Sequence, residues 1–173
     1  MTIASETSTI DRLLGHNAWA TRVLLDRCRD LTPTQFSQKF EMGLGTTHDT
    51  LLHIVGAMYR WADRIGDRPI RPRLEDEPRI WAPDEIIARL DACAPDLAGV
   101  IKRVVDENRL GEKIKFDAPD QPPFVFTRGT AIVHVTTHGV HHRAQALNML
   151  RRLGLNDLPD VDAVEWELVG NGD

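Results

Sequence analysis

The chain has 173 residues, enough for one domain with a full hydrophobic core and marginal for two. Hydrophobic residues make up 42% of it and charged residues 27%, an ordinary globular balance, and the net charge of −5 argues weakly against a nucleic-acid partner, which usually presents a basic patch. The longest run without Asp, Glu, Lys or Arg has fourteen residues, 129–142, whereas a membrane-spanning helix needs roughly 18 apolar residues. We therefore expect a single domain over residues 1–173 with neither a membrane nor a nucleic-acid partner.

Two features bear on location. The first six residues, MTIASE, lack the basic start and apolar stretch of a secretory signal peptide. The two cysteines, Cys28 and Cys93, form neither a CxxC pair nor a disulfide framework, and both fall at helical core positions. We expect a cytoplasmic protein whose two thiols are inert.

Four long helices are predicted, because apolar residues recur along the chain at spacings of three and four. The first covers about residues 5–29 and ends before a Leu-Thr-Pro segment, since proline disfavours helical geometry in the residue before it. The second starts after Gly45, where Thr46 or Thr47 can cap it, and ends near Gly66.

The third helix begins after Ala82 with Pro83-Asp84-Glu85, a composition typical of helix starts. Pro95 lies inside this helix and is expected to kink or locally break it. The fourth covers about residues 128–153 and stops at Gly154, a residue common just beyond helix ends.

The connections are long, because links between bundle helices usually have about 2–8 residues. Residues 113–116 and 124–127 alternate in polarity and could pair as two small strands. The pattern predicts an all-α fold, an up-down-down-up four-helix bundle with long connections and a small β-hairpin between its third and fourth helices. The acidic tail is expected to pack back through Trp166.

The strongest chemical signal is a cluster of histidines. The chain has seven, and four lie within nine residues: His134, His138, His141 and His142. Side chains four residues apart share one face of a helix, so either 134/138 or 138/142 could bind one metal ion. A helical wheel places His138 and His142 on the core-facing side and the other two at its edge. Buried histidines often form only hydrogen bonds, however, and a catalytic zinc-type site needs a third protein ligand.

The third ligand could be His16, His48 or His53. His48 falls in the first turn of the second helix, where an exposed polar role is expected. His53 lies about 140° from the centre of that helix's apolar stripe, so it is not an ordinary core residue. Its small neighbours Gly56 and Ala57 would leave room for an ion or ligand, and we rank His53 first.

Three blocks of the sequence resemble the DinB-like family of metal-dependent four-helix bundles, also called DinB/YfiT-like. The first block is His16-Asn-Ala-Trp-Ala-Thr. The second starts at Thr47 and includes His53-Ile-Val-Gly-Ala-Met-Tyr-Arg-Trp. The third, from His134 to Gln145, is close to the family's His-x-x-x-His-Arg-Gly-Gln. Order and spacing match from about residue 10 to 165, and Ala144 replaces the usual glycine.

The resemblance implies a metal site formed by His53, His138 and His142, the same pair that the wheel favours and the same third ligand. It implies a divalent ion, most often zinc or nickel, and a homodimer. It also implies a thiol-dependent transferase or isomerase activity, although many relatives have no known activity.

Three neutral imidazoles would leave an open position on a tetrahedral ion for water, hydroxide or a substrate anion. Our first hypothesis is an enzyme that transfers a low-molecular-weight thiol to a small electrophile. A metal-dependent hydrolase is the second, although the histidine block contains no carboxylate base and only His141 could serve. The third is a non-catalytic module of a stress response, in which the metal or a ligand stabilises the bundle or reports a signal.

Other polar residues keep two interpretations each. Arg143 and Gln145 could orient the histidine ligands or pair on the surface, and Asn17 could line a pocket. Trp61 is expected in the core rather than as a platform for substrate. The basic stretch 68–73 is most simply a solvated loop, but it could also guide an anionic substrate.

Overall fold

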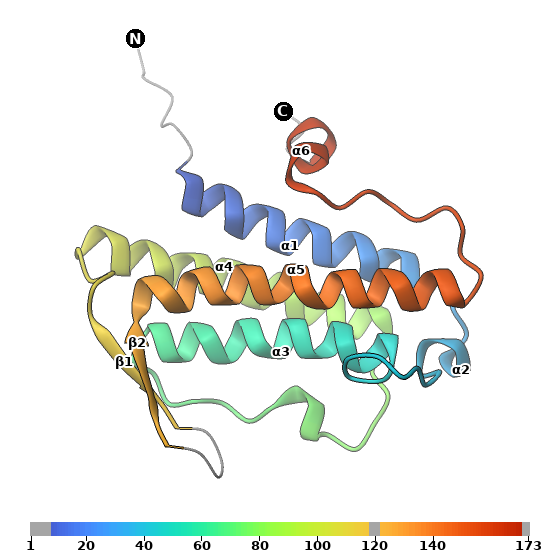
Figure 1. Ribbon diagram of the computed structural model, residues 1–173, viewed down its shortest axis with the longest axis horizontal. Coiled ribbons are helices and arrows are strands. Elements are labelled where there is room, and N and C mark those ends of the chain that lie inside the picture. The colour runs from blue at the N-terminus through green and yellow to red at the C-terminus, as the bar shows by residue number, and fades with distance from the viewer. Residues whose placement is uncertain (1–7, 118–121, 171–173) are drawn as a thin grey trace.

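The computed structural model describes residues 8–117 and 122–170. Within them the fold is mostly helical, as predicted, and is built on four helices of 19 to 25 residues (Figure 1). These helices are α1 (Thr9–Cys28), α3 (Thr47–Ile65), α4 (Pro83–Asp106) and α5 (Arg128–Arg152). None of the helices in the described ranges combines the length and apolarity needed to cross a membrane.

Polar residues cap the first turn of three of the four long helices. The Ser8 hydroxyl accepts a hydrogen bond from the Asp11 backbone N–H at the start of α1. Thr46 and Thr127 do the same for α3 and α5, so each cap satisfies an N–H that the helix itself cannot. The cap of α3 is one of the two threonines that the sequence offered.

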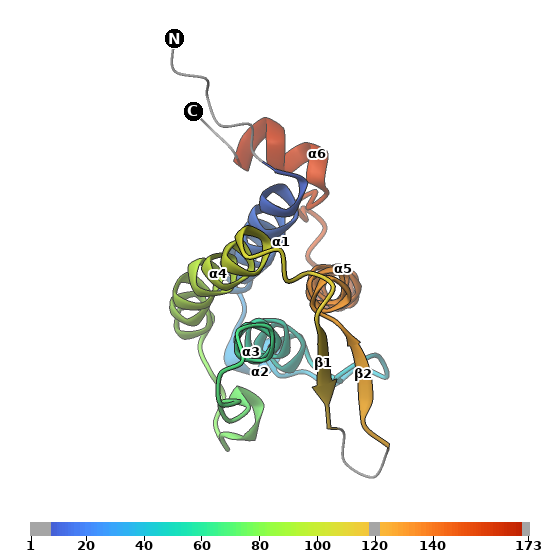
Figure 2. The ribbon, with the colours of Figure 1, turned by 90° about the vertical axis from the view of Figure 1, so that its left-hand side faces the viewer.

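The long helices pack as a square when seen end-on (Figure 2). Helix α1 packs against α4 and α5, and α3 packs against the same two from the other side. This order makes α3 and α5 neighbours, so residues far apart in sequence meet along their shared groove. The directional order up-down-down-up stays a prediction.

Helix α4 runs through Pro95 without the predicted local break, and the alternative kink stays a prediction. The structure shows one continuous helix with this proline inside it, not a local break. Pro95 lies on the exposed side of α4, whereas Leu90, Cys93 and Leu97 are buried in the core. Burial of the apolar residues before and after Pro95 therefore keeps the helix continuous, although proline cannot donate the backbone hydrogen bond.

The predicted hairpin is present between α4 and α5. Strands β1 (Lys113–Phe116) and β2 (Phe124–Thr127) pair antiparallel, with Lys113 opposite Thr127 and Phe116 opposite Phe124. Trp61 of α3 stacks on Phe116 with ring centroids 6.0 Å apart. The hairpin and the connection between α3 and α4 both extend beyond α3, on the side away from α1 (Figure 1).

Four shorter elements complete the described chain, and the sequence did not predict them individually: α2 (Pro33–Phe36), the 3₁₀ turn η1 (Leu74–Asp76), α6 (Ala163–Glu165) and the π-helical turn η2 (Trp166–Gly170). The tail packs back through Trp166 as predicted, since this residue is 8% exposed. Gly15 of α1 gives it room, because a Cβ there would lie 2.7 Å from the indole. His16 Nε2–H also holds the tail by donating to the Val161 carbonyl (2.8 Å).

Candidate metal centre

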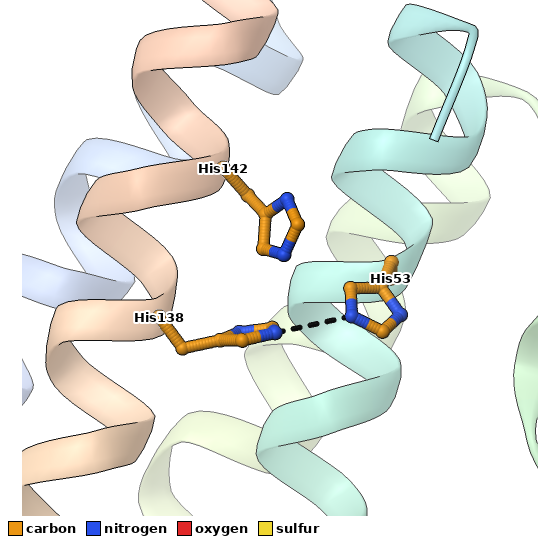
Figure 3. A group of neighbouring side chains, drawn as sticks. All are labelled: His53, His138 and His142. Carbon is orange, nitrogen blue, oxygen red and sulfur yellow. Dashed lines mark hydrogen bonds between the residues drawn. The ribbon is translucent and has the colours of Figure 1, made fainter. Parts of the chain in front are cut away.

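Three imidazoles meet in the groove between α3 and α5. His53 comes from α3, and His138 and His142 come from successive turns of α5 (Figure 3). One nitrogen from each ring lies within 4.8 Å of one from each of the other two, a separation that fits three ligands of one ion. The structure therefore brings together the three residues that the sequence proposed as ligands.

Two of these nitrogens face each other directly. His53 Nε2 and His138 Nε2 are 3.1 Å apart, which is hydrogen-bond distance (Figure 3). Because each neutral imidazole carries one N–H, one of the two nitrogens supplies the proton and the other a lone pair. A metal ion in place of that proton would receive both lone pairs, so the donor set fits a divalent transition metal.

Glu75 orients His53. Its carboxylate, in the turn η1, accepts a hydrogen bond from His53 Nδ1–H (2.6 Å) and forms an ion pair with Arg60 (3.0 Å). The sequence suggested that the space beside Gly56 holds an ion. The Glu75 carboxylate occupies that space instead, and a Cβ on Gly56 would lie 2.8 Å from it. With Nδ1 held as a donor, His53 presents its Nε2 lone pair to the centre.

Sequence reasoning missed Glu75, which lies 22 residues from His53 along the chain. No motif spacing links the two. The one available signal was the small residue at position 56, which was interpreted as room for an ion.

Gln145 orients His142 in the same way. Its amide oxygen accepts from His142 Nδ1–H (2.9 Å), and its amide N–H donates to His141 Nε2 (3.0 Å). The loop before α3 passes close to Gln145 at Gly43, which has a φ of +49°. A side chain would not fit there, because a Cβ would lie 2.4 Å from the Gln145 amide oxygen. Of the two interpretations left open for Gln145, orientation of a ligand is the one that the structure favours.

Arg143 neither orients a histidine ligand nor pairs on the surface, the two roles that the sequence suggested for it. It is 2% exposed and points toward α1, where it donates to Asn17 Oδ1 (2.6 Å) and Thr21 Oγ (3.2 Å). Asn17 is therefore part of the α1–α5 contact. Burial lowers the pKa of Arg143 to about 10, which still leaves the guanidinium charged at neutral pH.

The other histidines have separate positions. The predicted exposure of His48 is wrong: it is 2% exposed, donates from Nδ1 to Asp49 (2.8 Å) and accepts the Trp81 backbone N–H (2.9 Å). His48 thereby connects α3 to the segment that leads into α4. His134 is exposed one turn before His138, with its ring centroid 4.9 Å from that of Trp61.

Burial favours the neutral, metal-binding form of the α5 ligands. It lowers the pKa of His138 to about 3, with further lowering by His142 and His53, and it also lowers the pKa of His142. Burial alone would raise the pKa of Glu75, but the hydrogen bonds from His53 and Arg60 outweigh it and bring that pKa to about 2. At neutral pH the two ligands from α5 are therefore uncharged, and the ionised carboxylate of Glu75 lies behind the centre.

A cavity of about 490 Å³ opens beside the triad. His53, His138 and His134 line it, together with four arginines: Arg60, Arg64, Arg71 and Arg73. Trp61, predicted to be a core residue, is indeed mostly buried but also contributes to this lining. The basic connection is more than a solvated loop, because Arg71 is paired with the buried Asp63 at 2.5 Å.

Comparison with known proteins places this arrangement in a family. The model of the DinB family matches residues 5–167. The chain belongs to the DinB family. Comparison with curated proteins gave no match. Among solved structures, a DinB-like protein from Bacillus cereus ATCC 10987 has a similar fold, with a TM-score of 0.66 and 19% identity over 85% of this chain and 91% of that one.

Proposed function

We propose that this DinB-family protein binds one divalent ion, zinc or nickel, and uses it to transfer a low-molecular-weight thiol to a small electrophile. His53, His138 and His142 would hold the ion through their Nε2 atoms. The observation that carries the proposal is the convergence of three ligand nitrogens within 4.8 Å, beside an open cavity.

The ligand set determines the chemistry. A divalent ion held by three neutral imidazoles would lower the pKa of a coordinated thiol and so supply a thiolate at neutral pH. Glu75 and Gln145 keep His53 and His142 in the tautomer that exposes Nε2. The cavity next to His53 and His138 would hold the electrophile within reach of the sulfur.

Thiol transfer ranks above hydrolysis because of Glu75. Hydrolysis needs a general base beside the nucleophilic water. Glu75 is the carboxylate that contacts the triad within the described ranges, and both His53 and Arg60 already occupy it. A role as a non-catalytic metal-binding module remains the outcome if neither reaction is found.

The proposal includes the setting in which the protein acts. We expect a cytoplasmic homodimer whose partners are small molecules, with neither nucleic acid nor membrane among them. Exposed Val133 and Val140 lie two turns apart on α5 and would suit an interface between copies.

The direct test is turnover of electrophiles such as chlorodinitrobenzene with bacillithiol, mycothiol or glutathione. Metal-loaded protein should consume thiol and electrophile together, while chelated protein and the His138→Ala variant should not. Absence of turnover with all three thiols would count against the transferase, and metal-dependent ester hydrolysis in the same samples would favour the hydrolase.

A further inference from the structure

The wall of the cavity contains four arginines, one of which forms no ion pair with the described residues. Arg60 is paired with Glu75 at 3.0 Å and Arg71 with Asp63 at 2.5 Å. Arg73 lies at a longer 3.6 Å from Glu75. Arg64 has no carboxylate oxygen within 4.0 Å among residues 8–117 and 122–170. Its guanidinium donates a hydrogen bond to the Arg60 carbonyl (3.3 Å).

Aromatic rings hold Arg64 at the cavity. Its guanidinium carbon lies 4.6 Å from the centroid of Phe116 and 5.5 Å from that of Trp61. These contacts hold the guanidinium at the cavity wall, and arginine binds planar carboxylates through its fork of N–H groups. Burial, together with the charge of Arg60, lowers the pKa of Arg64, so an incoming anion would relieve an existing electrostatic cost.

An apolar hollow continues from the same wall. It has a volume of about 230 Å³ and is lined by Trp61, Phe116, Phe126, Thr130 and His134. Three of these residues, Trp61, Phe116 and His134, also line the larger cavity. A flat apolar group could therefore lie against the rings while a charged group on the same molecule reaches Arg64.

From these contacts we infer that the cavity binds an aromatic carboxylate, with its carboxylate on Arg64 and its ring system against Trp61, Phe116 and Phe126. The inference rests on the proposed function in one respect, since it names the class of electrophile that would be placed beside the metal. The other three arginines of the wall are already paired with carboxylates, so Arg64 supplies the specific contact.

Binding can be measured without metal or turnover. In chelated protein, isothermal titration calorimetry would compare 2-naphthoate with 2-naphthamide, a neutral compound of the same shape. Wild type should bind the naphthoate about tenfold or more tightly than the amide, as expected for a hydrogen-bonded charge. Equal affinities in wild type would overturn the inference whatever the variants do.

The Arg64→Gln variant should lose that preference and bind both compounds with the affinity of the amide. Arg64→Lys, which keeps the charge without the planar fork, should retain part of it. Arg103→Gln is the matched control, because it removes the same charge from an exposed position on α4 outside both hollows. A full preference for naphthoate in Arg64→Gln would also overturn the assignment.

One comparison keeps this inference separate from the proposed function. Chelated His138→Ala should still prefer 2-naphthoate, because neither Arg64 nor the apolar hollow uses that imidazole. Retained preference with no thiol transfer in the metal-loaded wild type would mean that the carboxylate site stands and the transferase proposal fails. Transfer without any preference for naphthoate would mean the reverse.

Discussion

The hydrogen bond between Glu75 and His53 places a carboxylate directly behind a candidate metal ligand. At 2.6 Å it fixes the tautomer of His53 and increases the basicity of Nε2. Glu75 is a positioning residue, because it acts on the site through the imidazole.

Replacing Glu75 with glutamine should therefore weaken metal binding. The variant keeps the shape of the side chain but loses its charge, and we expect roughly a tenfold rise in the metal Kd, in line with similar changes at other sites. Competition with a chromophoric chelator would measure it. Asp76→Asn removes the adjacent, exposed carboxylate and serves as the control. Equal Kd values for the two variants would remove the positioning role.

His138 makes the stability of the metal-free protein depend on pH. Its pKa is about 3 in the folded protein and about 6.5 when unfolded, so below pH 6.5 the unfolded chain binds more protons. Stability should fall as the pH decreases through this range. The lowered pKa of Glu75 contributes only below its ordinary value of 4.5.

Thermal unfolding in the presence of chelator, at pH 7.5 and pH 5.0, would test this expectation. Wild type should lose more Tm between the two values than His138→Gln does. An identical pH dependence for the two proteins would show that this imidazole is not held in its neutral form.

At the scale of elements, α1 and α5 approach closely where Gly139 faces Asn17. A Cβ on Gly139 would lie 2.1 Å from Asn17 Oδ1 and 2.8 Å from Arg143 Nη1. The Asn17–Arg143 hydrogen bond can form only because this position has no side chain.

Gly139→Ala should destabilise the fold by about 1–3 kcal/mol, the usual cost of overpacking a core. Gly99→Ala on α4 is the matched control, since nothing lies within 4 Å of its Cβ and alanine gains up to about 1 kcal/mol in a helix interior. Urea unfolding of both variants would decide. A stabilising effect at both positions would contradict the close contact.

The sequence predicted the long helices and the hairpin because these elements depend on local signals. Periodicity and caps such as Thr46 and Thr127 identify a helix within one segment. His48–Trp81 and His53–Glu75 join residues 33 and 22 positions apart, and the path of the connecting segment determines them. The predicted break at Pro95 is absent because the effect of this proline depends on the packing of its neighbours, which the local sequence does not reveal.

The predicted site likewise combines features that the local sequence determines with contacts that depend on the fold. His138 and His142 follow from helical spacing, and His53 from its position off the apolar stripe, because these are properties of single helices. Glu75, Arg64 and the true surroundings of Arg143 depend on which helices lie side by side, so they required the three-dimensional structure.

At the scale of the whole molecule, the square arrangement makes the triad a bridge between α3 and α5. An ion bound only by the folded chain stabilises it by mass action, by about 4 kcal/mol when its free concentration is a thousand times its Kd. Metal-loaded protein should therefore melt several degrees above chelated protein, and differential scanning calorimetry would show it. A Tm unchanged by chelation would argue against an ion that bridges the two helices.

The central claim is that His53, His138 and His142 bind a divalent metal. The most direct measurement is the metal content of purified protein by elemental analysis, comparing wild type with His53→Ala and His138→Ala, and with His134→Ala as a control from the same helix as His138. Wild type and His134→Ala should contain about one ion per chain, and the two ligand variants should contain little or none. An unchanged metal content in both His53→Ala and His138→Ala would contradict the proposed centre.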